Sequence, residues 1–127
     1  MSDSKEYVTS AGEYGSINIS EDVIALIAGR QALSVEGVAS LFSTPGKEII
    51  DIIGKKGVTR GVRIGIDDRQ VEIDVFIITE FGRPVGDTGE AVQRAVKNGV
   101  ESSVGLTVSA VNVHVCGIAL KGRKQQA

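Results

Sequence analysis

Residues 62–80 read VRIGIDDRQVEIDVFIITE, and their alternation gives the strongest signal of the fold class. Apolar side chains occupy alternate positions on both sides of the polar turn at residues 67–70. They are Val62, Ile64 and Ile66 before it, and Val71, Ile73, Val75 and Ile77 after it. A period of two predicts strands, and the turn joins them into a β-hairpin. The hairpin therefore has one apolar face that must be buried and one face that is open.

The segments on either side of this hairpin add two helices and two strands. Downstream, Pro84 opens a helix in which Val92, Val96, Val100 and Val104 recur every fourth residue, Gly105 ends it, and residues 108–120 form a strand. Upstream, residues 16–20 form a short strand, and Ser20 caps a helix that ends at Gly37. Within that helix, helical spacing connects Val23, Ile24, Ile27, Ala28 and Gln31.

The order of elements is strand, helix, strand, strand, helix, strand. It predicts an α+β, two-layer sandwich of ferredoxin-like order, with both helices on one face of a mostly antiparallel sheet. We expect a mobile leader at residues 1–14, one domain at 15–120 and a basic tail at 121–127. Residues 44–53 are expected to form a short helix. The open sheet face is predicted to carry Asn18, Arg63, Glu72, Asp74, Phe76, Asn112, His114 and Cys116.

Composition limits the classes of function. The net charge of −2 gives no general attraction to polyanions, and only five of the 127 residues are aromatic. The single cysteine, Cys116, excludes an intramolecular disulfide and indicates a reducing, cytoplasmic compartment. No apolar run approaches the ~20 residues needed to span a bilayer, so direct membrane insertion is not expected.

A basic cluster formed by Lys55, Lys56, Arg60 and Arg63 is the one candidate contact for a partner or polyanion. Residues 54–57 read GKKG, which resembles the loop with which K-homology domains hold a nucleic-acid backbone. That loop needs a helix after it, whereas the residues that follow alternate as a strand. Nucleic-acid binding therefore remains an alternative that the sequence context disfavours. A second alternative is lipid contact by Ile49, Ile50 and Ile53 beside these lysines, although those isoleucines are expected to cover the core.

The chain offers no set of catalytic residues. His114 and Cys116 stand two apart on one strand, where parallel side chains do not readily form a nucleophile and base pair. A zinc site would need Glu72 or Asp74 from another strand. We therefore expect no enzyme, no cofactor and no metal.

Three blocks of the chain resemble the alkaline shock protein family of Gram-positive envelope stress proteins. The blocks are GSINISEDVIALIAGRQALSVEGVASL, VEIDVFIITEFG and AVQRAVKNGVESSVGLTVSAVNVHVCGI, within residues 15–120. The resemblance implies a non-enzymatic scaffold at the cytoplasmic face of the cell envelope. It also implies self-association and recruitment by a membrane-embedded partner in envelope stress or homeostasis. Some branches look more like regulatory adaptors linked to lipid metabolism, and the sequence leaves the branch open.

Overall fold

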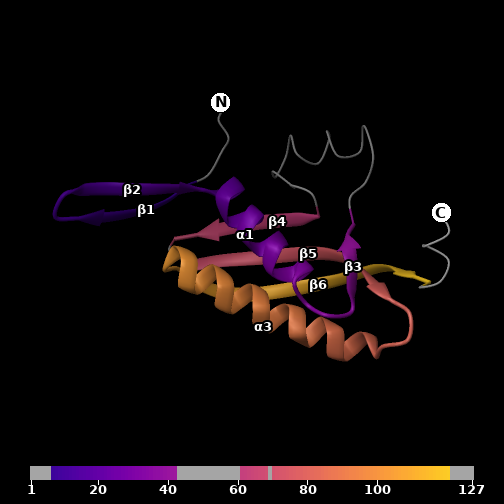
Figure 1. Cartoon of the computed structure of the whole chain (residues 1–127). Coiled ribbons are helices and arrows are strands. Elements are labelled where there is room, and N and C mark those ends of the chain that lie inside the picture. Colours follow the sequence, from indigo (N-terminus) through magenta and orange to yellow (C-terminus); the bar gives the residue numbers. More distant parts are fainter. Residues whose placement is uncertain (1–6, 43–60, 69, 121–127) are drawn as a thin grey trace, which may run out of the picture.

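Strand β5 (Gln70–Glu80) is the centre of the fold, because every other strand of the main sheet pairs with it. The structure is a computed structural model, and it describes residues 7–42, 61–68 and 70–120. The other elements are β1 (Tyr7–Gly12), β2 (Gly15–Ser20), α1 (Glu21–Leu33), β3 (Val38–Leu41), β4 (Val62–Asp67), α3 (Val85–Val104) and β6 (Thr107–Ala119). The two helices of the described residues, α1 and α3, lie on one face of the sheet, which confirms the predicted two-layer α+β class (Figure 1).

The sheet combines antiparallel and parallel pairs. Strands β3 and β4 both run antiparallel to β5, whereas β6 runs parallel to it along residues 70–80. The parallel pair arises because α3 carries the chain back across the sheet before β6 begins. The hairpin β4–β5 was predicted from its alternation, and the pairing of Asp67 with Gln70 closes it.

Strand β3 was not predicted, and it shares one edge of β5 with β4. Leu41 pairs with Ile77, the amide of Phe42 donates to the carbonyl of Phe76, and Val62 pairs with Val75. Because β6 occupies the other edge of β5, β3 and β4 are two halves of one edge strand, separated by residues 43–60. The expected helix at 44–53 lies outside the described residues.

The N-terminal prediction was wrong in two respects. Residues 7–12 do not belong to a mobile leader, because they form β1 and pair antiparallel with β2. Strand β2 in turn is not part of the main sheet, and the hairpin β1–β2 projects from the domain (Figure 1). One apolar cross-strand pair attaches this hairpin to the domain. Val8 is buried in the core, and its partner Ile19 packs against the core.

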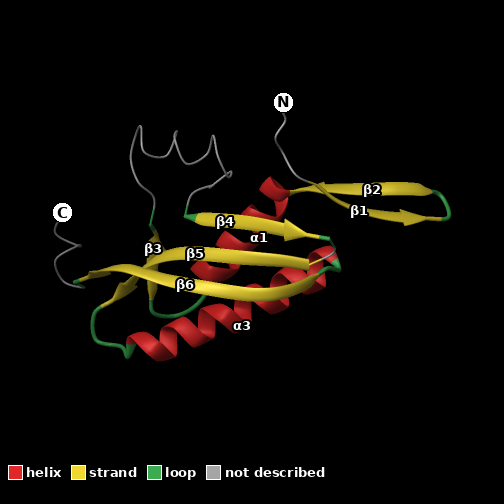
Figure 2. Ribbon diagram, turned by 180° about the vertical axis from the view of Figure 1, so that it is seen from behind, coloured by secondary structure: helices red, strands yellow, loops and turns green. Residues whose placement is uncertain are grey.

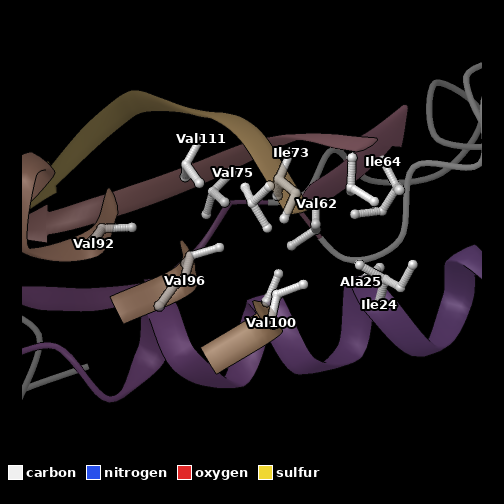
Figure 3. Packing of buried hydrophobic residues seen from close by; sticks show 14 of the residues in the cluster. Ile24, Ala25, Val62, Ile64, Ile73, Val75, Val92, Val96, Val100 and Val111 are labelled. Atoms are coloured by element: carbon white, nitrogen blue, oxygen red, sulfur yellow. The ribbon is translucent and has the colours of Figure 1, made fainter. Parts of the chain in front are cut away.

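The core consists of branched aliphatic side chains between the sheet and the two helices (Figure 3). The predicted inner faces are confirmed: Val71, Ile73, Val75 and Ile77 of β5 are fully buried, as are Val92, Val96 and Val100 of α3. Each such side chain contributes roughly 1.5–3 kcal/mol relative to an exposed position. A stripe of valines every fourth residue therefore fixes which side of α3 meets the sheet.

Helix α1 ends earlier than the sequence predicted. Its last residue is Leu33, and the Ser34 hydroxyl donates to the Gln31 carbonyl, so Gly37 is not the cap. Gly37 instead forms the turn into β3 with a φ of 102°. A Cβ atom there would lie 2.8 Å from the Thr88 hydroxyl, so this glycine also lets the turn approach α3 closely.

Candidate functional site

The open face of the sheet carries charged, polar and aromatic side chains side by side. The helices cover the opposite face, so this side lies toward the viewer in Figure 2. Three adjacent strands supply it, because odd residues of β4 and even residues of β5 and β6 point to this side. We call this surface the open face and define it by Arg63, Glu72, Asp74, Phe76, Asn112 and His114.

Asp74 is the centre of the open face. The register aligns it with Arg63 on β4 and with Asn112 on β6. Its Oδ2 accepts from Arg63 Nη2 at 3.3 Å and from Nε at 3.4 Å. Its Oδ1 accepts from Asn112 Nδ2 at 3.1 Å and lies 3.2 Å from His114 Nε2. One carboxylate thus links three strands.

This network changes the acidity of Asp74. Partial burial alone would raise the pKa of its carboxyl group, because desolvation disfavours the charged form. The hydrogen bonds from His114 and Asn112 and the charge of Arg63 outweigh that effect, so the pKa of Asp74 lies below its ordinary value. The carboxylate is therefore the form that holds the face together at neutral pH.

Phe76 and His114 form the aromatic part of the open face. They are directly paired across β5 and β6, and their rings stack with centroids 4.5 Å apart at 14°. The stack fixes the plane of the His114 imidazole ring, and Nε2 of the same ring lies 3.2 Å from Asp74 Oδ1. Aromatic side chains and arginine, both present here, are enriched in protein interaction surfaces.

A shallow hollow lies beside the network, on the β4 side. It measures about 390 Å³ and is lined by Arg63, Ile64, Gly65, Glu72 and Asp74. Gly65 pairs with Glu72 and contributes no side chain, which leaves this space open. The Glu72 carboxylate accepts from Asn112 Nδ2 at 2.9 Å and so borders the same hollow.

Of the four basic residues predicted to contact a partner, the structure describes only Arg63. Lys55, Lys56 and Arg60 lie outside the described residues. The guanidinium of Arg63 is half-exposed and pairs with Asp74, so it belongs to the open face rather than to an isolated basic patch.

One predicted member of the open face, Asn18, is placed differently. Asn18 lies on the projecting hairpin, where its side chain accepts from the Thr9 hydroxyl at 2.7 Å, because β2 left the main sheet. Cys116 sits where the β5–β6 register shifts, and its exposed thiol lies 3.7 Å from the His114 carbonyl oxygen. The partner of His114 Nε2 is the Asp74 carboxylate and not the Cys116 thiol. Within residues 7–42, 61–68 and 70–120, no three His, Cys, Asp or Glu side chains converge as metal ligands.

The model of the alkaline shock protein family, described as having a cell envelope-related function, matches residues 9–120. The chain belongs to the alkaline shock protein family. This confirms the resemblance that the three sequence blocks carry.

Relatives of the chain occur in Gram-positive bacteria. YloU of Bacillus subtilis is 33% identical over 108 residues, which covers 84% of this chain and 90% of YloU. Spy1614 of Streptococcus pyogenes is 30% identical over 110 residues, covering 85% and 91% of the two chains. Among solved structures, a MamM CTD chain aligns with a TM-score of 0.48 and 12% identity, covering 76% of this chain and 94% of that chain. No helix in the described part of the chain is long and apolar enough to cross a bilayer.

Proposed function

We propose that this protein is a non-enzymatic scaffold at the cytoplasmic face of the cell envelope, acting in envelope stress or homeostasis. In this role it associates with itself and is recruited by a membrane-embedded partner. Membership of a family with cell envelope-related function supports the cellular context. The molecular role is supported by the open face, whose side chains suit recognition rather than bond chemistry.

One observation carries the proposal: the polar groups of the open face satisfy one another. Asp74 accepts from side chains on two neighbouring strands, and His114 is held by Asp74 and Phe76. A His–Asp pair can act as a catalytic base only with a nucleophile or substrate beside the imidazole, and the Cys116 thiol lies against the His114 carbonyl oxygen instead. A cross-linked network instead keeps the side chains in fixed positions, which lowers the entropic cost of binding a partner.

The test is recovery of the protein with the membrane fraction of its native host. The double variant Phe76→Ala/His114→Ala removes the aromatic stack and should lower recovery at least fivefold. Arg94→Ala, on the exposed side of α3, is the matched control and should leave recovery unchanged. Circular dichroism checks that each variant is folded. Equal recovery of the double variant and the wild type would exclude the open face as the recruiting surface.

The identity of the recovered partner also distinguishes the envelope scaffold from the regulatory adaptor linked to lipid metabolism. A membrane protein of the envelope supports the scaffold. An enzyme of lipid synthesis, recovered through the same face, would assign the regulatory adaptor role instead.

A further inference from the structure

The outer face of α1 is apolar, which is unusual for a helix that is half exposed. Its inner side buries Ile24, Ala25, Ala28 and Ala32 against the sheet. Its outer side exposes Val23, Leu26 and Leu33 with exposed fractions of 45%, 61% and 47%. A helix that is apolar on both sides is normally covered on both sides. Of the residues predicted at helical spacing, Ile24 and Ala28 are buried, whereas Val23 lies on the outer side.

The outer residues of α1 form one continuous strip, which we call the α1 strip. It consists of Asp22, Val23, Leu26, Arg30 and Leu33, all exposed. At about 100° per residue they fall within one side of the helix. By contrast, the outer side of α3 exposes Gln93, Arg94, Lys97 and Asn98, which is the ordinary solvated pattern. The two helices of the same layer therefore differ in what their outer sides can bind.

The α1 strip is self-complementary in charge. Leu26 is its most exposed apolar residue, with the acid Asp22 four positions before it and the base Arg30 four positions after it. When two copies of such a helix pack antiparallel with Leu26 on a two-fold axis, Asp22 of one copy lies level with the partner's Arg30. The same contact occurs twice, because a two-fold interface repeats every pair.

A hollow beside the strip offers space for an apolar side chain. It measures about 130 Å³, and Ala25, Leu26, Gly29, Leu33, Leu41 and Val62 line it together with Arg30. Gly29 keeps it open, since a Cβ atom there would already lie 3.2 Å from Leu41 Cδ1. The strip thus presents both projecting side chains and a recess, the combination that helix packing requires.

We infer that α1 is the surface through which two copies of this chain associate, antiparallel and with Leu26 on the two-fold axis. The inference deepens the proposed function and rests on the self-association named there. It leaves the open face free, because the helix layer lies on the other side of the sheet (Figures 1 and 2). A dimer would then present two open faces to partners.

The interface is small, so the dimer should be weak. A single helix face buries less than the ~800 Å² per partner of a standard interface. We expect a dissociation constant on the order of 10–100 μM, measured for the full chain by sedimentation equilibrium. Leu26→Lys should abolish the dimer. Ile118→Lys, which places the same charge at an exposed apolar residue of β6, should not.

Charge reversal tests the antiparallel geometry directly. Asp22→Arg and Arg30→Asp each set like charges against each other in their own homodimers, and each should weaken association about tenfold. An equimolar mixture of the two single variants pairs opposite charges at both positions. The mixture should therefore recover the wild-type dissociation constant. Circular dichroism of each variant shows whether it is folded, since Asp22 also stabilises the first turn of α1.

Several results would overturn the inference. A dimer that is insensitive to Leu26→Lys and to charge reversal would place self-association on another face and leave the proposed function intact. A wild-type monomer that is still recovered with membranes would exclude the dimer but not the scaffold. Loss of binding to phosphatidylglycerol vesicles in Leu26→Lys, without a change in mass, would assign the strip to lipid. A dimer that forms only after residues 43–60 are deleted would mean that this segment covers the strip.

Discussion

Asp74 shows how much of the candidate site rests on a single side chain. The alternation in residues 71–77 is enough to place Asp74 on the open side of the sheet. Its contacts to Arg63, Asn112 and His114 depend on the register of three strands. A sequence pattern can state which face a residue occupies, but not which residues 11, 38 or 40 positions away meet it there.

The low pKa of Asp74 predicts an acid-dependent loss of stability. A carboxyl group with a folded-state pKa below its unfolded value stabilises the fold above the unfolded pKa of about 3.9. That contribution disappears as the pH falls through the folded pKa. Asp74→Asn should therefore reduce the free energy of unfolding by about 1–2 kcal/mol at pH 7. In acid, the free energies of unfolding of the variant and the wild type should approach each other, because the wild-type carboxylate becomes protonated.

Urea denaturation at pH 7 and at successively lower pH values measures this effect. Asp67→Asn is the control, because it removes a carboxylate from the exposed end of β4 without touching the network. A constant difference between Asp74→Asn and wild type across the acid range would contradict the assignment of the network to the charged carboxylate.

At the scale of elements, helix α3 was predictable and the edge strand β3–β4 was not. Local signals bound α3: Pro84 precedes it, valines recur every fourth residue, and Gly105 ends it in the left-handed conformation with a φ of 78°. Strand β3 has only four residues, Val38–Leu41, and pairs with β5 across the intervening segment 43–60. A strand this short has no detectable period without its neighbour.

Alanine substitutions at Gly89, inside α3, and at Gly105, at its C-terminal end, should change the free energy of unfolding in opposite directions. Gly105→Ala forces an L-residue into the left-handed region and should lower the free energy of unfolding by about 1 kcal/mol. Gly89 lies inside the helix, and a Cβ atom added there would meet no heavy atom within 4 Å. Gly89→Ala should therefore raise the free energy of unfolding by about 0.5–1 kcal/mol. Thermal or urea unfolding measures both. A stabilising effect of Gly105→Ala would contradict the left-handed conformation of Gly105, and a destabilising effect of Gly89→Ala would contradict the open space beside Gly89.

At the scale of the whole molecule, the N-terminal hairpin is an appendage held to the domain mainly through Val8 and Ile19. Its strands pair only with each other among the described residues. Residues 1–14 are polar and contain glycine, so they give no periodic signal. One buried side chain, Val8, is enough to anchor the hairpin, and a single apolar residue does not make a pattern. Both the leader and the placement of the first strand were mispredicted for this reason.

Removing residues 1–14 should leave a folded domain of lower stability. The burial of Val8 is lost, which costs about 1.5–3 kcal/mol, while the core between β5 and the helices remains. Urea denaturation should show one cooperative transition at a lower midpoint, and amide hydrogen exchange of β5 should still be slow. Complete unfolding of the shortened chain would show that the hairpin is an integral part of the domain.

Local patterns predicted the α+β class, the hairpin at 62–80, helix α3, most of the open face and the family. Each of these depends on a local period or on blocks of residues close together in the chain. Only the folded chain shows that β1 pairs with β2 outside the main sheet, that β3 and β4 share one edge of β5, and that α1 exposes Leu26. These features depend on contacts between residues distant in the sequence, and no local pattern specifies which distant residues will meet.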